Sequence, residues 1–170
     1  MITNSEVRRA AILHIPCTAN TLGPLLRRTR DIDALTRKLV YTSVVGTKLK
    51  HPRQLSIADR ELIVKDGLGD REPGVRVAAG KLVMAWFDVV LSEAGKDNEE
   101  SDEGEDEWQG DDSGVMKGLA KFLSLFDVVG PGEAVAVNAV LSIFTTRREL
   151  PDVFIFAGTW ISSASNLEME

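Results

Sequence analysis

The sequence is poor in the residues that form disulfides and metal sites, with one cysteine and two histidines among 170 residues. Because Cys17 stands alone, no disulfide can form within the chain, and a reducing compartment is expected. His14 and Cys17 have the spacing of two metal ligands, but no second pair accompanies them, so we expect neither a metal site nor another cofactor. No apolar run reaches the length of a membrane span, and the first residues lack the apolar stretch of a signal peptide, so no membrane partner is expected.

The sequence also lacks the patterns that mark an active site. No set of Ser, His and Asp and no pair of carboxylates stands at a distinctive spacing. Gly67 and Gly69 begin a glycine pattern, but the third glycine is absent, and a helix precedes them where a dinucleotide-binding fingerprint needs a strand. We therefore expect that the chain is not an enzyme.

What the sequence does contain is a recurring helical hairpin. Residues 66–90 read as the end of one helix, a turn at Asp70, and a second helix whose apolar residues recur every three or four positions. Arg76 lies six residues after Asp70, just inside the second helix. Asp31 and Arg37 repeat this spacing in the same helix–turn–helix context.

The period of these hairpins predicts the fold class. Arg8 begins a third copy, whose first helix is missing from the sequence. Arg8, Arg37 and Arg76 are separated by 29 and then 39 residues, a range typical of helical solenoids. We therefore predict an all-α fold, a HEAT-repeat α-solenoid of stacked antiparallel helix pairs, and a fragment of a longer array.

The Asp and Arg of each hairpin are predicted to form a structural ladder. An Asp in the turn can accept hydrogen bonds from free amides at the start of the next helix, and the Arg can reach the Asp of its own or a neighbouring repeat. Such pairs would fix the stacking angle, so Asp31, Arg37, Asp70 and Arg76 are assigned to structure first. The alternative is a set of surface ion pairs, which would contribute little to stability.

Residues 1–150 are assigned to the repeats, with one interruption. Residues 93–113 hold 11 acidic residues and one Lys, a composition that cannot bury apolar surface, so we expect a disordered insertion. It would act as a solvated linker or, alternatively, compete with nucleic acid for a basic surface. A further helix pair is expected over 115–148. Residues 151–170 are expected to be a connector or a truncated next repeat, although the run 153–155 also fits a strand.

Charge is distributed unevenly along the chain. Residues 1–90 have a balance of +6 and residues 91–170 a balance of −12, and residues 8–53 alone hold ten basic and two acidic residues. Stacked repeats would gather these basic side chains on one edge or on the concave face, a surface suited to the phosphates of double-stranded DNA without sequence preference. The residues predicted to contact DNA are Arg27, Arg28, Arg30, Lys38, Lys48, Lys50 and Arg53. The alternative is a solvated charged face, which the charge run alone favours; it is the family resemblance described next that shifts the interpretation of the set toward DNA.

Three segments carry a resemblance to a known family. They read RRTRDIDALTRKLVYTSVV from residue 27, HPRQLSIADRELIVKDGLGDREPGVRVAAGKLVMAWFDVV from residue 51, and EAVAVNAVLSIFTTRREL from residue 133. These segments resemble the N-terminal part of the condensin subunit 3 family, the HEAT-repeat subunits of the fungal type. The resemblance covers most of residues 6–150 apart from the acidic insertion, and nothing is carried over to residues 151–170.

The resemblance implies a non-catalytic subunit that binds the kleisin subunit of condensin and holds double-stranded DNA in a basic groove. Such a subunit supports mitotic chromosome condensation, with the ATPase on the SMC subunits, which this chain would meet only indirectly. The implied location is the nucleus and the chromosome, with the cytoplasm possible outside mitosis. The alternative function is a HEAT-repeat scaffold that binds only protein, with its basic face meeting an acidic partner.

Overall fold

The computed structural model describes residues 4–49, 51–96 and 112–146, and all regular structure in these residues is helical. In chain order the elements are α1 (Ser5–His14), α2 (Ala19–Leu26), η1 (Arg27–Arg30), α3 (Ala34–Leu39), η2 (Val40–Val45), α4 (Gly46–Lys48), η3 (Pro52–Gln54), α5 (Ile57–Leu68), α6 (Pro73–Lys96), α7 (Asp112–Leu123) and α8 (Glu133–Thr146). Elements η1 and η3 are 3-10 helices, and η2 is a π-helical segment between α3 and α4. The predicted all-α class is confirmed.

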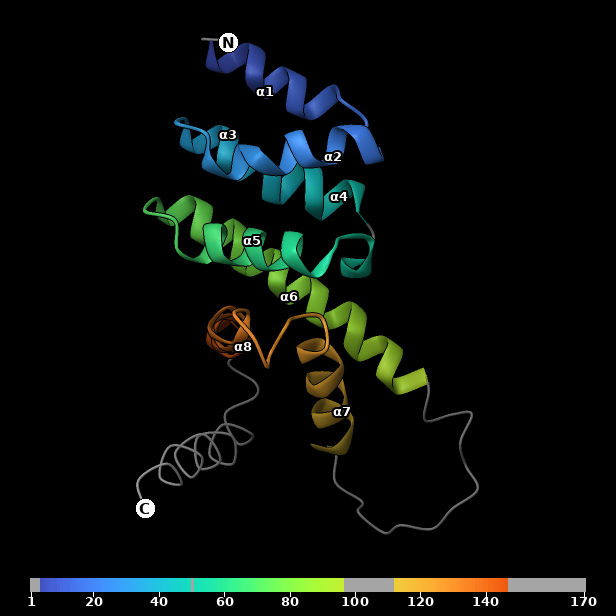
Figure 1. Cartoon of the computed structure of the whole chain (residues 1–170). Helices are drawn as coiled ribbons and strands as arrows, with labels where there is room; N and C mark the ends of the chain where they lie inside the picture. The colour runs from blue at the N-terminus through green and yellow to red at the C-terminus, as the bar shows by residue number, and fades with distance from the viewer. Residues whose placement is uncertain (1–3, 50, 97–111, 147–170) are drawn as a thin grey trace.

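Helices α1 to α6 form two layers that stack along one axis (Figure 1). One layer holds α1, then the continuous helix of α3, η2 and α4, and then α6, each in contact with the next. The other layer holds α2 with η1, followed by α5. We call the side with the turns at residues 31–33 and 69–72 the turn edge. The opposite side, with the end of α1, α4, η3 and the end of α6, is called the loop edge (Figure 1).

Polar side chains fix where two of these helices begin. Asp33 Oδ2 accepts a hydrogen bond from the Thr36 amide (2.8 Å) at the start of α3. Ser56 Oγ accepts one from the Asp59 amide (3.1 Å) at the start of α5, and the Asp59 carboxylate lies 2.7 Å from the same hydroxyl. Both caps satisfy amides that have no partner inside the helix. Ser56 is therefore the N-cap of α5, which begins at Ile57.

One continuous apolar core runs from the two layers into α7 and α8. Tyr41 and Phe87 are fully buried at its centre, and the ring of Phe87 meets that of Phe122 edge-on, with the centroids 5.7 Å apart. Trp86, Phe122 and Phe126, which the helical spacing assigns to the core, are buried. The third helix pair therefore belongs to the same folded unit as the first two.

Helices α7 and α8 do not continue the direction of the stack. In Figure 1, α7 stands upright against the second half of α6, and α8 is seen end-on below α5, whereas α1 to α6 run across the view. Helix α7 approaches α6 closely at Gly118, where an added Cβ would lie only 2.5 Å from Leu91 Cδ1. A helix pair is present in the described part of the expected range, residues 115–146, but it is turned relative to the earlier pairs.

The helix boundaries around the acidic segment differ from the expectation. Helix α6 continues through Lys96, so residues 93–96 are helical where the insertion was expected to begin, and α7 already begins at Asp112. Residues 97–111, with most of the expected insertion, lie outside the described residues. The expected connector at 151–170 also lies outside them.

The close contact between α5, η2 and α6 provides a test of the packing. A Cβ added at Gly67 would lie 2.5 Å from Ala79 Cβ and 2.7 Å from Tyr41 Cε1. Tyr41 is 1% exposed and cannot move into solvent. We therefore expect Gly67→Ala to lower the free energy of unfolding by about 1–3 kcal/mol, measured by urea denaturation.

Gly95→Ala is the matched control, because Gly95 also lies in a helix, α6, but nothing is within 4 Å of its added Cβ. This change is expected to be neutral or to stabilise the protein by up to about 1 kcal/mol. Equal destabilisation by both replacements would contradict the packing argument.

Candidate functional site

Buried Arg and Asp side chains join neighbouring repeats at the turn edge. Arg8 Nε and Nη2 donate to the Asp31 carboxylate (3.0 and 2.9 Å), and Arg37 Nε and Nη2 donate to the Asp70 carboxylate (2.7 and 2.9 Å). In both pairs two parallel donors meet two carboxylate oxygens, the strongest arrangement for such a pair. Each Arg therefore reaches the Asp of the next repeat.

The Arg side chains also hold the turn that precedes them. Arg37 Nη1 donates to the carbonyl oxygen of Asp31 (2.9 Å), and Arg76 Nη1 donates to that of Asp70 (2.7 Å). Each of these two Asp carboxylates also accepts a hydrogen bond from the backbone amide two residues further on, at 3.0 Å for Asp31 and 2.8 Å for Asp70. The structure thus brings the four predicted ladder residues into two turns of the same construction, and their effect on stability stays a prediction.

The buried pairs favour the charged form of both carboxylates. Hydrogen bonds from Arg37 lower the pKa of Asp70 and outweigh burial, which acts in the opposite direction. Burial raises the pKa of Asp31, but hydrogen bonds from Arg8 and from the Asp33 amide outweigh it and bring this pKa below its usual value. The pKa of Arg37 is raised by its hydrogen bonds to Asp70. Both pairs are therefore ionised at neutral pH.

A second row of ion pairs runs beside the ladder. Arg9 donates to Asp33 through two nitrogens (2.9 and 2.8 Å), and Arg30 donates to Asp66 in the same way (3.0 Å each). Thr29 Oγ1 also donates to Asp66 (2.8 Å). The hydrogen bonds from Arg9 hold the pKa of Asp33 well below its usual range. Sequence reasoning missed this row, because its partners are 24 and 36 residues apart and no local spacing marks them.

Two residues predicted to contact DNA have partners inside the protein. Arg30 is paired with Asp66, although its side chain is 69% exposed. Lys48 Nζ donates to the carbonyl oxygen of Ile15 (2.7 Å) and to two further carbonyls in the last turn of α1 (3.1 Å each). A cation at this position satisfies free carbonyls at the end of a helix and complements its dipole. Lys48 therefore has a structural role in holding α1 on the stack.

Two other predicted residues are about half exposed and loosely paired. Arg28 Nη1 lies 3.5 Å from the carboxylate of Asp31, and Arg53 Nη1 lies 3.6 Å from that of Glu93. Such exposed pairs are weak, so a phosphate could replace either carboxylate at little cost. Both Arg side chains remain available to a ligand.

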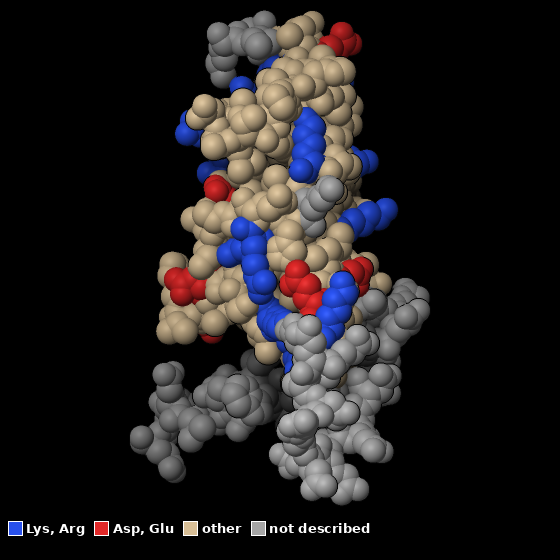
Figure 2. All heavy atoms as spheres, turned by 90° about the vertical axis from the view of Figure 1, so that its right-hand side faces the viewer, with Lys and Arg blue, Asp and Glu red and all other residues tan. Residues whose placement is uncertain are grey.

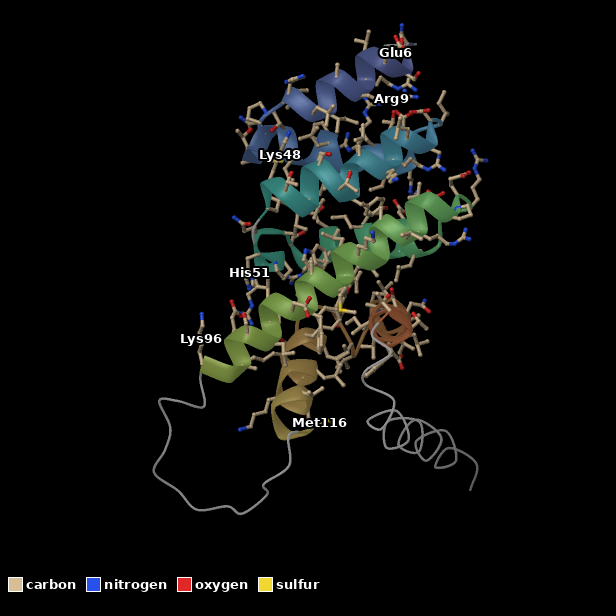
Figure 3. The ribbon with its side chains drawn as sticks, turned by 180° about the vertical axis from the view of Figure 1, so that it is seen from behind. Glu6, Arg9, Lys48, His51, Lys96 and Met116 are labelled. Carbon is tan, nitrogen blue, oxygen red and sulfur yellow. The ribbon has the colours of Figure 1, made fainter. Side chains whose placement is uncertain are left out.

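The structure does not gather the predicted residues on one surface. Arg30 lies at the turn edge, and Lys48 lies at the loop edge (Figures 1 and 3). The continuous helix from α3 to α4 separates these edges by about 22 Å. Arg27 and Lys38 are exposed and form no ion pair with another described residue, and Lys50 lies outside the described residues. The expectation of a single basic surface is corrected, because antiparallel helices carry the two ends of a charge-rich segment to opposite edges.

The loop edge carries charges of both signs. Figure 3 shows Lys48, His51 and Lys96 at this edge, with Glu6 and Arg9 at the opposite one. Figure 2 shows Lys and Arg side chains spread over the height of this edge, with Asp and Glu mainly in its lower half. The upper half, near the end of α1 and α4, is therefore the part most suited to a polyanion.

The stacked helix pairs and the repeated Asp–Arg turn define an α-solenoid of the HEAT-repeat type. In sequence, the chain is similar to condensin complex subunit 3 of Schizosaccharomyces pombe and of Homo sapiens, at 43% and 40% identity over 86 residues. The same subunit of Saccharomyces cerevisiae is 36% identical over 91 residues. These matches cover 50–51% of this chain and 8–10% of the relatives.

A solved structure extends the similarity to more of the chain. A chain in the crystal structure of the S. pombe condensin Cnd3-Cnd2 subcomplex matches with a TM-score of 0.68 and 32% identity, over 88% of this chain and 16% of that one. A comparison with protein-family models finds no match. The predicted resemblance to condensin subunit 3 and the predicted HEAT-repeat α-solenoid are confirmed. The chain corresponds to a small part of the length of each relative.

The Arg37–Asp70 pair allows a test of the ladder. Arg37→Met or Asp70→Asn leaves the other buried group without its partner, so each is expected to lower the free energy of unfolding by about 3–5 kcal/mol. The double variant should lose less than the sum, with a coupling of at least about 1 kcal/mol in urea denaturation. Lys38→Met, an exposed change in the same helix, is the control and should have little effect. Additive losses would show that the two side chains act independently.

The lowered pKa values of Asp31 and Asp70 predict a loss of stability in acid. Their folded-state pKa lies below the unfolded value, so the stabilisation is present above the unfolded pKa and is lost as the pH falls through the folded one. We expect the melting temperature to decrease between about pH 5 and pH 2. Asp70→Asn should reduce this decrease, because one titrating group is removed. An unchanged pH profile in the variant would contradict the assignment.

Proposed function

We propose that this chain is part of a condensin HEAT-repeat subunit, without catalytic activity of its own, that binds the kleisin subunit and double-stranded DNA. The observation that carries the proposal is the similarity to condensin complex subunit 3, at 43% identity in the S. pombe relative. The similarity to a chain of the Cnd3-Cnd2 subcomplex supports a protein partner, for which the kleisin is the candidate.

DNA binding is proposed for the exposed cations alone. Arg27 and Lys38 are free of ion pairs to other described residues, and Arg28 and Arg53 are only loosely paired. Contacts from these side chains to phosphates would release counterions and would not depend on base sequence. Binding should therefore weaken steeply as the salt concentration rises.

A scaffold that binds only protein is the second candidate. The internal pairing of Arg30 and Lys48 favours it, because these charges already stabilise the fold and are less available to phosphates. The two functions differ in the ligand: the first requires affinity for duplex DNA, and the second requires affinity for a protein alone.

The proposed function places the chain in the nucleus and on chromosomes, with a cytoplasmic pool possible outside mitosis. It would support mitotic chromosome condensation through the kleisin. ATP hydrolysis would occur on the SMC subunits, which the chain would meet only indirectly. The similarity to condensin subunit 3 supports this chromosomal setting.

DNA binding can be tested by fluorescence anisotropy with a short labelled duplex at several salt concentrations. We expect measurable binding by the wild type at low salt and at least tenfold weaker binding by the Arg27→Glu, Lys38→Glu double variant. If both residues contact phosphates, the slope of log affinity against log salt should also decrease by about 1.8.

The matched control is the Lys65→Glu, Lys81→Glu double variant, which changes the net charge equally at two exposed positions outside the predicted DNA contacts. It should bind DNA nearly as well as the wild type. Equal losses in both variants would mean that only net charge matters. No wild-type binding at low salt, together with binding to a kleisin segment, would support the protein-only scaffold.

A further inference from the structure

The ladder of Asp and Arg side chains reaches Arg76, whose guanidinium has one edge without a partner among the described residues. Arg76 Nη1 donates to the carbonyl oxygens of Asp70 (2.7 Å) and Arg71 (3.0 Å), as Arg37 Nη1 does in the preceding turn. Arg37 uses its other two nitrogens to bind the Asp70 carboxylate. Among the described residues, no carboxylate occupies the corresponding place at Arg76.

The next turn does not supply the missing carboxylate. At the turn between α7 and α8, the Asp127 amide instead donates to Glu61 Oε1 (2.8 Å), and the residue six positions after Asp127 is Glu133. Because α8 is turned away from the direction of the stack, a groove remains between it, the end of α5 and the first turns of α6. Arg76 lines this groove, whose volume is about 870 Å³.

The lining of the groove indicates the chemistry of its ligand. Apolar side chains from three helices, including Val64, Val77 and Val135, form part of its wall. Lys65 and Lys81 lie beside them, and no Asp or Glu is among the lining residues. A phosphate backbone would leave the apolar wall without a partner, whereas a peptide with a carboxylate beside apolar side chains would fit both parts.

We propose that this groove binds a peptide segment of a partner protein, with an Asp or Glu carboxylate of the peptide on the free edge of Arg76. Apolar side chains next to that carboxylate cover Val64, Val77 and Val135. The bound carboxylate takes the place that Asp70 has on Arg37, so the partner supplies the next step of the ladder. The proposal does not depend on DNA binding or on a role in condensin.

The test starts from a displayed library of random 12-residue peptides, selected on the full chain and counter-selected on Arg76→Gln. We expect the enriched peptides to share an Asp or Glu flanked by apolar residues. The best peptide is then compared by fluorescence anisotropy with a twin in which Asn or Gln replaces the acidic residue. We expect the acidic peptide to bind at least about tenfold more tightly, and duplex DNA not to displace it.

Three variants locate the site. Arg76→Gln should abolish the preference for the acidic peptide, and Arg71→Gln, which removes a neighbouring exposed Arg outside the groove lining, should preserve it. Val77 is 59% exposed, so Val77→Glu should keep the fold and the carbonyl contacts of Arg76 while weakening both peptides at least fivefold. Thermal melts should show that the three variants remain folded.

Three results would overturn the proposal: no enrichment of acidic peptides, equal binding of the acidic and amide twins, or an unchanged preference in Arg76→Gln. A fourth result would identify the chain's own sequence as the occupant. Helix α8 ends at Thr146 beside the groove, and a few residues later the sequence has Asp152 followed by Val153 and Phe154. If the peptide binds only after Asp152→Asn, the occupant is the chain's own segment and not a partner.

Discussion

The guanidinium of Arg37 holds two turns at once, and we interpret this arrangement as the constraint that sets the stacking of the helices. One side of Arg37 binds carbonyl oxygens of its own turn, and the other side binds the Asp70 carboxylate in the next repeat. Because the guanidinium is planar and its donors point in fixed directions, neither turn can slide without breaking one set of bonds. The desolvation of both charges offsets much of their attraction, so we interpret the pair mainly as a device that fixes one stacking geometry.

The direction of α8 follows from the end of this ladder. At the turn between α7 and α8, Glu61 of α5 binds the Asp127 amide, and Gly132 approaches the Glu61 carboxylate so closely that a Cβ would not fit. The third pair is therefore positioned by α5 and by the packing of α7 on α6. Because Glu61 and not an Asp–Arg pair holds this turn, the third helix pair does not adopt the stacking angle of the first two. The groove beside Arg76 results from this difference in angle.

The sequence was informative wherever the structure repeats a local spacing. Asp31 and Asp70, which share the spacing of six residues to Arg37 and Arg76, lie in turns of the same form. The distribution of the basic residues could not be predicted, because the partner of Arg30 is 36 residues away and those of Lys48 are 33 to 36 residues away. Pairing at such distances follows from the stacking of the repeats and leaves no mark in local spacing.

A count of charges along the chain therefore overstates the charge that the fold offers to a polyanion. Five of the ten basic residues in 8–53 are bound to Asp carboxylates or to helix carbonyls: Arg8, Arg9, Arg30, Arg37 and Lys48. The exposed cations that remain are few and are divided between two edges. A few phosphate contacts release too few counterions for tight binding at physiological salt. In the proposed function this segment therefore supplies only a few phosphate contacts, so DNA binding by this chain alone should be confined to low salt.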